Sequence, residues 1–240
     1  MSMDGSAYTD RVREDFDRLA DLPESGGWDH NAHYHPFLLK QLPPRLDEAL
    51  EVGCGTGAFA RLLAERCGRV VAIDLSPRMV EVARARSWGH PNVEYVVADA
   101  ASWEFPQERF DCVASIMTLH HLSLSLMIIK LREALRPGGI LLLLDLYRAS
   151  TVTDRLVALL TGTASKAIRL AKTGSLTERQ SSESRRAWEE HGTTDAYPTL
   201  GEVRRACEME LGGADVKRHL LWRYTVVWRK PEGDADSVWV

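Results

Sequence analysis

Short hydrophobic runs alternate with amphipathic segments between residues 46 and 147. The runs contain few polar residues, as expected of strands buried on both faces of a sheet. They are Ala49–Val52, Val70–Asp74, Val93–Ala98, Phe110–Ser115 and Ile140–Leu144. The segments between them have the spacing of helices. This alternation predicts a parallel sheet with helices on both of its faces.

Turn signals mark the ends of two of these helices. Ser76 supplies an N-cap and Pro77 a first-turn proline for a helix that contains Met79. A later helix has apolar residues at helical spacing: Leu124, Met127, Ile128, Leu131 and Leu135. The Pro-Gly-Gly sequence at 137–139 is expected to end that helix before the next strand.

The two flanks of this core have a different pattern. Residues 1–45 combine helical turns and loops with aromatic and histidine residues, and we expect them to form an N-terminal flap. Residues 148–196 contain a helix-like run from Val152 to Leu170 and then a polar stretch. An insertion placed after a sheet strand is often a lid over the carboxyl ends of the strands.

The last part of the chain returns to regular structure. Residues 197–231 predict a helix over Leu200–Leu211 and two strands, Val216–Leu221 and Tyr224–Trp228. Only about two residues separate the strands, so they should form an antiparallel hairpin. Residues 232–240 are acidic and are expected to form a tail.

Composition places these elements in one soluble domain. The chain has 240 residues, of which 45% are hydrophobic and 27% charged. A formal net charge of −4 argues against an extended nucleic-acid-binding surface. No apolar run approaches the ~20 residues that span a membrane, and the acidic N-terminus is unlike a signal peptide. The widely spaced cysteines predict reduced thiols in a cytoplasmic protein; they are Cys54, Cys67, Cys112 and Cys207.

A glycine-rich segment carries the strongest chemical signal. Residues 51–57, with the sequence EVGCGTG, lie between the first predicted strand and the helix that follows it. Glycines allow a sharp turn and a close approach of a ligand, and the helix N-terminus offers N–H groups to an anion. The segment also fits a dinucleotide fingerprint, with Asp74 at the spacing of a ribose-binding acid. A nicotinamide-dependent oxidoreductase and a turn without a ligand are therefore alternatives.

Three acidic residues favour a different cofactor. Glu51, Asp74 and Asp99 stand at the carboxyl ends of three successive predicted strands, where they should line one crevice. Glu51 precedes the glycines, where it would neutralise a cationic ligand and repel a pyrophosphate. A ligand with an amino group, a ribose and an adenine would find a partner for each part.

This arrangement resembles the class I S-adenosylmethionine-dependent methyltransferases. The resemblance covers roughly residues 46–147. Its motifs occur in the order of the family: the glycine segment, Asp74, Asp99–Ala100, Asp111–Val113, Leu119–Leu122 and Leu135–Gly139. It implies an α/β, Rossmann-like, doubly wound sheet of seven mostly parallel strands with an antiparallel C-terminal strand. It also implies a single methyltransferase domain whose cofactor-binding core is residues 46–147.

The resemblance assigns cofactor-binding roles residue by residue. Glu51 and the glycines would hold the methionine part, Asp74 the ribose hydroxyls and Asp99 the adenine amine. Leu75 and Met79 would lie beside the adenine. The residues predicted to bind the cofactor in this crevice are Glu51, Gly53, Cys54, Gly55, Gly57, Asp74, Leu75, Met79, Asp99, Ala100 and Met117.

Two adjacent histidines are the predicted catalytic residues. His120 and His121 follow the fourth strand and should lie near the transferable methyl group. The pKa of histidine suits either residue to take a proton from an acceptor hydroxyl or amine. His121 is preferred because its position matches the more usual histidine of the family. In the alternative, one histidine packs against the sheet and the other only shapes the loop.

A second histidine cluster lies in the predicted flap. We expect Tyr34 and His35 to touch the cofactor or the acceptor as the flap closes. A capping loop without chemistry is the alternative. A metal site of His30, His33 and His35 is disfavoured because the sequence implies no carboxylate or cysteine partner, so we predict no metal.

The sequence therefore predicts transfer of a methyl group from S-adenosylmethionine, which leaves as S-adenosylhomocysteine, to an O, N or C atom of a small molecule. The displacement would be in-line, and residues 1–45 and 148–197 would build the acceptor site. An NAD-dependent oxidoreductase and a cofactor-binding protein without catalysis are the alternatives. A protein acceptor and a homodimer paired through 148–196 stay open, whereas nucleic acid and membrane are not expected as partners.

Overall fold

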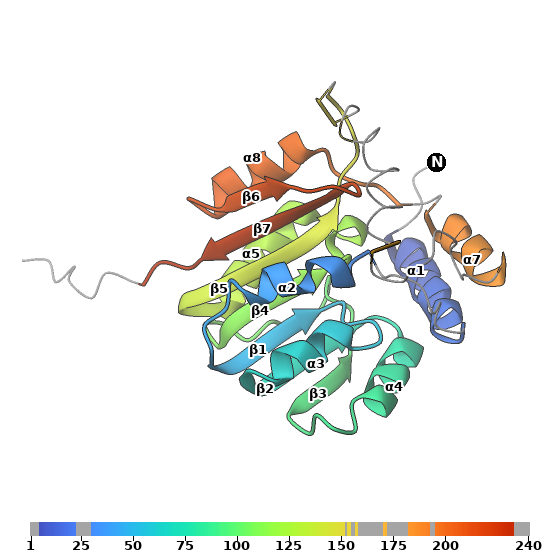
Figure 1. Cartoon of the computed structure of the whole chain (residues 1–240), viewed down its shortest axis with the longest axis horizontal. Coiled ribbons are helices and arrows are strands. Elements are labelled where there is room, and N and C mark those ends of the chain that lie inside the picture. Colours follow the sequence, from blue (N-terminus) through green and yellow to red (C-terminus); the bar gives the residue numbers. More distant parts are fainter. Residues whose placement is uncertain are drawn as a thin grey trace, which may run out of the picture.

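The structure, a computed structural model, describes residues 5–22, 30–151, 153–154, 157, 170–171, 182–192 and 195–232. Its centre is a seven-stranded sheet with the strand order β3-β2-β1-β4-β5-β7-β6 (Figure 1). The strands are β1 (Leu46–Val52), β2 (Cys67–Asp74), β3 (Val93–Val97), β4 (Phe110–Ile116), β5 (Leu135–Leu146), β6 (Asp215–Arg218) and β7 (Arg223–Arg229).

The direction of the strands matches the sequence-based prediction. The neighbouring pairs from β3 through β5 are parallel, and β7 is antiparallel to both β5 and β6. The predicted mostly parallel, Rossmann-like sheet with an antiparallel C-terminal strand is therefore confirmed. The hairpin forms because the few residues between β6 and β7 are too short for a helical crossover.

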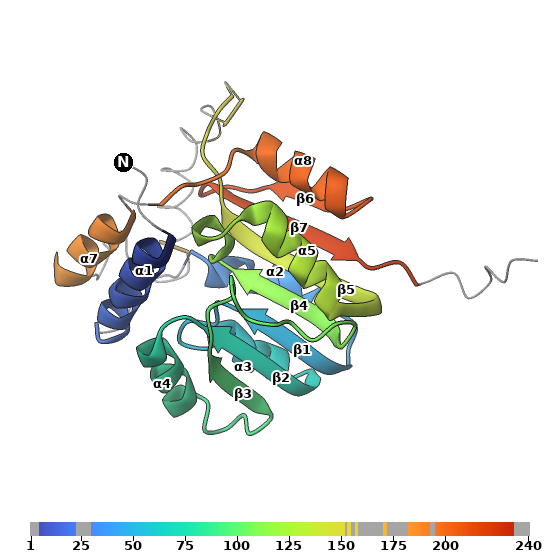
Figure 2. The ribbon, with the colours of Figure 1, turned by 180° about the vertical axis from the view of Figure 1, so that it is seen from behind.

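Helices cover both faces of the sheet (Figures 1 and 2). One face carries α2 (His35–Leu39), α3 (Ala58–Ala64) and α4 (Pro77–Arg86), and the other carries α5 (Leu124–Ala134) and α8 (Leu200–Glu210). In β1, Ala49 packs in the cluster of α3, whereas Leu50 and Val52 pack in the cluster of α5. Both sides of the strand are buried, which explains its nearly continuous apolar sequence.

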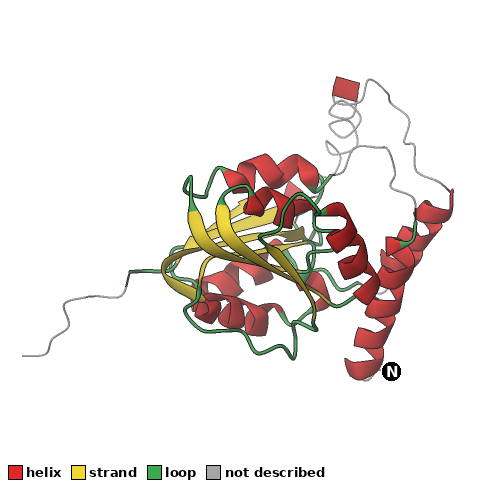
Figure 3. Ribbon diagram, turned by 90° about the horizontal axis from the view of Figure 1, so that it is seen from below, coloured by secondary structure: helices red, strands yellow, loops and turns green. Residues whose placement is uncertain are grey.

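Two further helices lie at the carboxyl edge of the sheet, the edge toward which β1 and β4 point. They are α1 (Gly5–Ala20) and α7 (Ser182–Gly192), which lie beside each other in Figures 1, 2 and 3. α1 packs on α4 through a small buried cluster of Leu19, Ala20 and Met79. Helix α1 of the predicted flap and helix α7 of the predicted insertion thus lie where the strands end, whereas α2, also within residues 1–45, packs on a face of the sheet.

The boundary between α5 and β5 differs from the prediction. The apolar spacing placed Leu135 on the helix and began the strand at Ile140, but Leu135 pairs with Phe110 in the sheet. The register between β4 and β5 shifts between Phe110 and Cys112, and Gly138 has a φ of 77°. A glycine adopts this left-handed conformation without steric cost, so the strand bulges instead of starting after the glycines.

Some predicted segments fall outside the described residues. The helix-like run from Val152 to Leu170 does so almost entirely, as do residues 233–240 of the tail. In the part of the chain that is described, no helix has the length and apolar character needed to cross a membrane.

Candidate functional site

The glycine segment turns between β1 and α3 through three left-handed glycines. Gly53, Gly55 and Gly57 have φ angles of 76°, 49° and 76°. A Cβ on Gly53 would lie 1.8 Å from Thr118 Oγ1, and one on Gly57 would lie 2.3 Å from the Tyr95 hydroxyl. A Cβ on Gly55 would meet no described atom within 4 Å. Packing therefore requires Gly53 and Gly57, whereas Gly55 faces space that a ligand can enter.

Two buried carboxylates lie beneath this turn. Asp74 Oδ2 accepts the Gly55 N–H at 2.7 Å, and its Oδ1 accepts the Ser76 N–H at 2.9 Å. Glu51 is buried, and its Oε2 has no hydrogen-bond partner among the described residues. Burial and the nearby Asp74 raise the pKa of Glu51 well above its usual range. A cationic donor beside Glu51 would satisfy this oxygen and restore its negative charge.

The other predicted crevice residues follow neighbouring strands. Asp99, after β3, is half-buried and accepts hydrogen bonds from the Ala101 N–H at 2.9 Å and the Ser102 hydroxyl at 3.2 Å. Met117 follows β4 with a φ of 57°, an uncommon value for a residue with a side chain. Cys54, Met79 and Ala100 are buried, and Leu75 is half-buried. Since β1, β2 and β3 are neighbours, Glu51, Asp74 and Asp99 lie along one edge of the sheet.

Helix α1 covers this edge. Asp17 accepts a hydrogen bond from the Ser76 hydroxyl at 2.5 Å and from the Arg78 N–H at 3.2 Å, which ties α1 to the first turn of α4. Farther along the edge, the Tyr8 hydroxyl lies 3.3 Å from His121 Nδ1. The ring of Phe16 meets that of His121 edge-on, with their centroids 5.6 Å apart. α1 thus reaches from the acids to the two predicted catalytic histidines.

The two histidines have different surroundings. His120 Nδ1 lies 2.6 Å from Asp145 Oδ1, and its main-chain N–H donates to Asp145 Oδ2 at 3.0 Å. Burial lowers the pKa of His120, but the charge of Asp145 and this hydrogen bond outweigh that effect and raise it overall. Burial and the neighbouring His120 and His191 lower the pKa of His121 to about 2. His120 is thus held by a carboxylate, whereas His121 is neutral.

The segment that follows α7 reaches the same histidines. His191 Nδ1 lies 3.2 Å from Asp15 Oδ2 on α1, and His191 Nε2 lies 4.0 Å from Asp195 Oδ2. Asp195 Oδ1 is 3.5 Å from His121 Nδ1, and Asp195 Oδ2 is 3.9 Å from His120 Nε2. The loop after β4, helix α1 and residues of the predicted insertion therefore converge at one place.

The second predicted histidine cluster is arranged differently. The Tyr34 hydroxyl donates to the Leu220 carbonyl at 2.8 Å, and His35 packs against Phe59 of α3 with ring centroids 5.0 Å apart. Both residues are buried, so their contact with a cofactor or an acceptor stays a prediction. His30 and His33 belong to no group with metal-ligand spacing among the described residues.

Sequence reasoning missed several residues of this site. Tyr8, Asp145, His191 and Asp195 contact the predicted histidines but were not candidates. Asp145 near the end of β5 could have been found by the rule that selected Asp99, since both stand at the carboxyl end of a strand. The other three come from the flanks, whose position in space no local pattern indicates.

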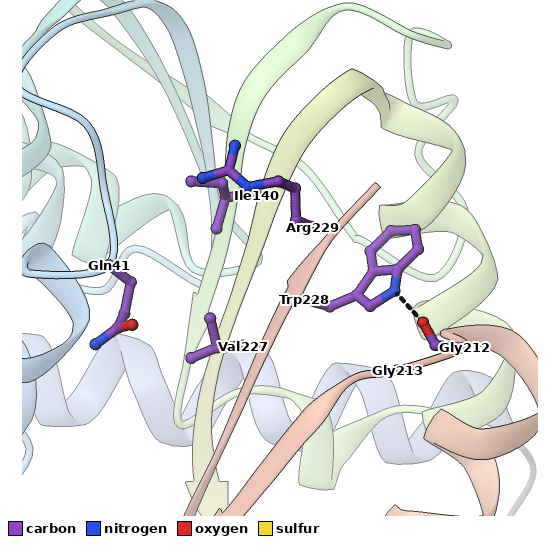
Figure 4. A pocket seen from close by; sticks show the side chains of 7 residues that line it. All are labelled: Gln41, Ile140, Gly212, Gly213, Val227, Trp228 and Arg229. Atoms are coloured by element: carbon purple, nitrogen blue, oxygen red, sulfur yellow. Dashed lines mark hydrogen bonds between the residues drawn. The ribbon is translucent and has the colours of Figure 1, made fainter. Parts of the chain in front are cut away.

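A separate pocket lies at the opposite end of the sheet. It is formed by Gln41, Ile140, Gly212, Gly213, Val227, Trp228 and Arg229 (Figure 4). The indole Nε1 of Trp228 donates to the Gly212 carbonyl at 3.0 Å. Because ligands of open α/β sheets bind at the carboxyl ends of the strands, this pocket is not the candidate site.

Known proteins resemble the chain across this crevice. A family model described as "Methyltransferase domain" matches residues 49–139. An uncharacterised methyltransferase of Mycobacterium bovis is 29% identical over 208 residues, which are 85% of this chain and 98% of that protein. The malonyl-acyl-carrier-protein O-methyltransferase of Serratia marcescens is 35% identical over 43% of this chain and 40% of that protein.

Solved structures share the fold. One is the N-methyltransferase NodS of Bradyrhizobium japonicum in complex with S-adenosylhomocysteine, with a TM-score of 0.62 and 18% identity. The match covers 92% of this chain and 99% of the NodS chain. Another is phosphoethanolamine N-methyltransferase 1 of Haemonchus contortus, in complex with phosphoethanolamine and S-adenosylhomocysteine. It matches with a TM-score of 0.65 and 16% identity, over 98% of this chain and 51% of the other. Residues 49–139 contain the glycine segment, the three acids and both predicted catalytic histidines.

Proposed function

Because this chain is a class I S-adenosylmethionine-dependent methyltransferase, we propose that its carboxyl-edge crevice transfers the cofactor's methyl group to an O, N or C atom of a small molecule held beneath α1. One observation carries the assignment of the crevice: Glu51 Oε2 is buried without a hydrogen-bond partner among the described residues, at the start of the turn in which the Cβ position of Gly55 is open. A buried acceptor without a partner needs a donor, and the amino group of the cofactor is a cationic one.

The residues around this point fit the rest of the cofactor. Asp74 Oδ2 accepts the Gly55 N–H, and Oδ1 accepts the Ser76 N–H. Each oxygen keeps a further lone pair, so together they can accept two ribose hydroxyls. Asp99 stands at the next strand end, in reach of the adenine amine. The proposed walls of the site are Gly53, Cys54, Gly57, Leu75, Met79, Ala100 and Met117. When bound, S-adenosylmethionine supplies an activated methyl group, so the protein mainly binds and aligns the reactants.

The acceptor side is polar. Tyr8, His120, His121 and Asp195 surround it, and each has a group that can hold or take up a proton. This favours an acceptor whose hydroxyl, carboxyl or amine group loses a proton, over a carbon acceptor. Two similar proteins are named for malonyl-acyl-carrier protein and for phosphoethanolamine, which carry such groups.

His120 is the better placed of the two proposed catalytic histidines. When His120 Nδ1–H donates a hydrogen bond to Asp145, Nε2 keeps a free lone pair. Nε2 faces Asp195 and the acceptor side. His121 lies next to it, beneath Tyr8. The four free and buried cysteines agree with the predicted cytoplasmic location; that location and a homodimer stay predictions.

Calorimetric titration with S-adenosylhomocysteine tests the proposed function directly. We expect micromolar binding with one site per chain, because the product retains the amino, ribose and adenine groups. NADH is the matched control, since it shares the ribose and adenine but carries a pyrophosphate in place of the cationic amino group that Glu51 would bind. Binding of NADH alone would support the oxidoreductase alternative. Binding of neither S-adenosylhomocysteine nor NADH would refute the proposed site.

The variant His120→Asn tests the catalytic assignment. Asparagine can still donate a hydrogen bond to Asp145 but lacks the Nε2 atom. We expect methyl transfer to fall at least tenfold, whereas the affinity for S-adenosylhomocysteine changes by less than about twofold. The measurement is formation of S-adenosylhomocysteine with a panel of small carboxylic acids, alcohols and amines. His90→Ala, in the remote loop between α4 and β3, is the control, and an unchanged rate in His120→Asn would exclude the role.

A further inference from the structure

Two buried polar atoms on the acceptor side have no hydrogen-bond partner within the described part of the chain. They are His121 Nε2 and Asp195 Oδ1, whose side chains are 7% and 2% exposed. Buried polar atoms in folded proteins are nearly always satisfied by protein, water or an ion. The two side chains are neighbours, and His121 Nδ1 lies 3.5 Å from Asp195 Oδ1, so a species bound between them would satisfy Asp195 Oδ1.

The geometry of the surrounding side chains fits a metal ion. One ligand atom from each of His120, His121 and Asp195 lies within 4.8 Å of the other two. His121 Nδ1 is 3.5 Å from Asp195 Oδ1, and His120 Nε2 is 3.9 Å from Asp195 Oδ2. Ligands about 2.0–2.1 Å from a tetrahedral Zn²⁺ ion stand about 3.3 Å apart. The three ligand atoms would therefore have to approach one another by up to about 1.5 Å to coordinate one ion.

The outer contacts are those of metal-binding histidines. Asp145 holds His120 Nδ1 at 2.6 Å, so that Nε2 is directed toward Asp195. Asp15 lies 3.2 Å from His191 Nδ1, and His191 Nε2 lies 4.0 Å from Asp195 Oδ2. A histidine that binds a metal almost always donates its other ring N–H to a carboxylate or carbonyl. His191 has this outer contact but lies outside the group of three, so it would have to move toward the ion to become a fourth ligand.

The charges also favour a cation. Asp145 and Asp195 are both almost fully buried, with side chains 1% and 2% exposed. Among the described residues, neither forms an ion pair with a lysine or an arginine. Two buried carboxylates without a fixed positive partner are costly, and a divalent ion would compensate both. Imidazole nitrogens select zinc and similar transition metals over Mg²⁺ and Ca²⁺, which prefer oxygen.

We propose that His120, His121 and Asp195 bind one divalent transition-metal ion of the zinc class, with His191 as a fourth ligand. The ion would join the loop after β4 to the segment that follows α7, and so fix part of the predicted insertion over the crevice. With the ion bound, His120 Nε2 would be a ligand and no longer the proposed base, and the ion would instead act on the acceptor's oxygen or nitrogen as a Lewis acid. That catalytic role rests on the proposed function, whereas binding of the ion can be measured without it.

Titration with Co²⁺ tests the site. The full chain, free of any histidine tag and stripped of metal, should bind one Co²⁺ per molecule with the visible absorption of a tetrahedral complex. Excess Zn²⁺ should abolish this absorption. Asp195→Asn should weaken Co²⁺ binding at least tenfold, and Asp145→Asn, which changes only an outer contact, should weaken it about 10- to 100-fold. The control His90→Ala should bind as the unaltered chain does.

Thermal unfolding and a cofactor titration complete the test. Zn²⁺ should raise the Tm of the unaltered chain but not that of Asp195→Asn, and His121→Asn should repeat this result if Asp195→Asn fails to fold. No visible absorption, or equal affinities in Asp195→Asn and the unaltered chain, would overturn the metal site. Titration with S-adenosylhomocysteine in the presence of EDTA tests the proposed cofactor crevice separately, so the two proposals can fail independently.

Discussion

Asp74→Ala is expected to weaken the binding of S-adenosylhomocysteine about a hundredfold or more. A carboxylate that accepts two ribose hydroxyls makes two charge-assisted hydrogen bonds, each worth about 1.5–3 kcal/mol. Their loss, about 3 kcal/mol at least, corresponds to two factors of ten in affinity at about 1.4 kcal/mol each. The variant also frees the Gly55 and Ser76 N–H groups, which loosens the turn that the cofactor must contact.

Calorimetry on matched variants separates these contributions. Asp74→Asn keeps one oxygen acceptor without the charge and should give an intermediate affinity. Asp47→Ala removes a carboxylate at the other end of the sheet, where that side chain is 91% exposed, and should bind as the unaltered chain does. Asp74→Ala with normal affinity and normal unfolding would show that the ribose lies elsewhere.

The acids of the proposed cofactor site could be predicted from the sequence because each belongs to a local pattern. Glu51, Asp74 and Asp99 each stand at the end of a predicted strand, and a parallel sheet brings such ends to one edge whatever the flanks do. Asp74 illustrates this, since its 19-residue separation from Gly55 spans a single helix and strand. The strand pattern thus predicts both the fold and the position of the acids.

The acceptor half depends on contacts that no local pattern contains. Tyr8 and His121 are 113 positions apart, and Asp15 and His191 are 176 apart. The sequence indicated helical turns and loops in residues 1–45 and a polar stretch where α7 forms, but not against which edge of the sheet these segments pack. Similarly, the difference between His120 and His121 arises from Asp145, which lies 25 positions away on β5. The sequence therefore selected the histidine pair and preferred His121, because no local pattern showed that Asp145 holds His120.

The last prediction separates packing from ligand access within the glycine segment. Gly57→Ala is expected to lower the free energy of unfolding by about 2–5 kcal/mol. A left-handed conformation costs an alanine about 1–2 kcal/mol, and overpacking adds about 1–3 kcal/mol. The new Cβ would lie 2.3 Å from the Tyr95 hydroxyl, which is buried and hydrogen-bonded to Ser87 at 2.8 Å and so has no room to withdraw. Urea denaturation measures this loss.

Gly55→Ala is the matched variant, since Gly55 is also left-handed but a Cβ there meets no described atom within 4 Å. It should cost only the conformational term of about 1–2 kcal/mol, yet it should weaken S-adenosylhomocysteine binding because its methyl group occupies the space proposed for the cofactor. In a Tyr95→Leu background, the stability penalty of Gly57→Ala should fall toward that of Gly55→Ala. Equal penalties for the two variants in the unaltered background would contradict this, because of Gly55 and Gly57 only the latter lacks room for a side chain.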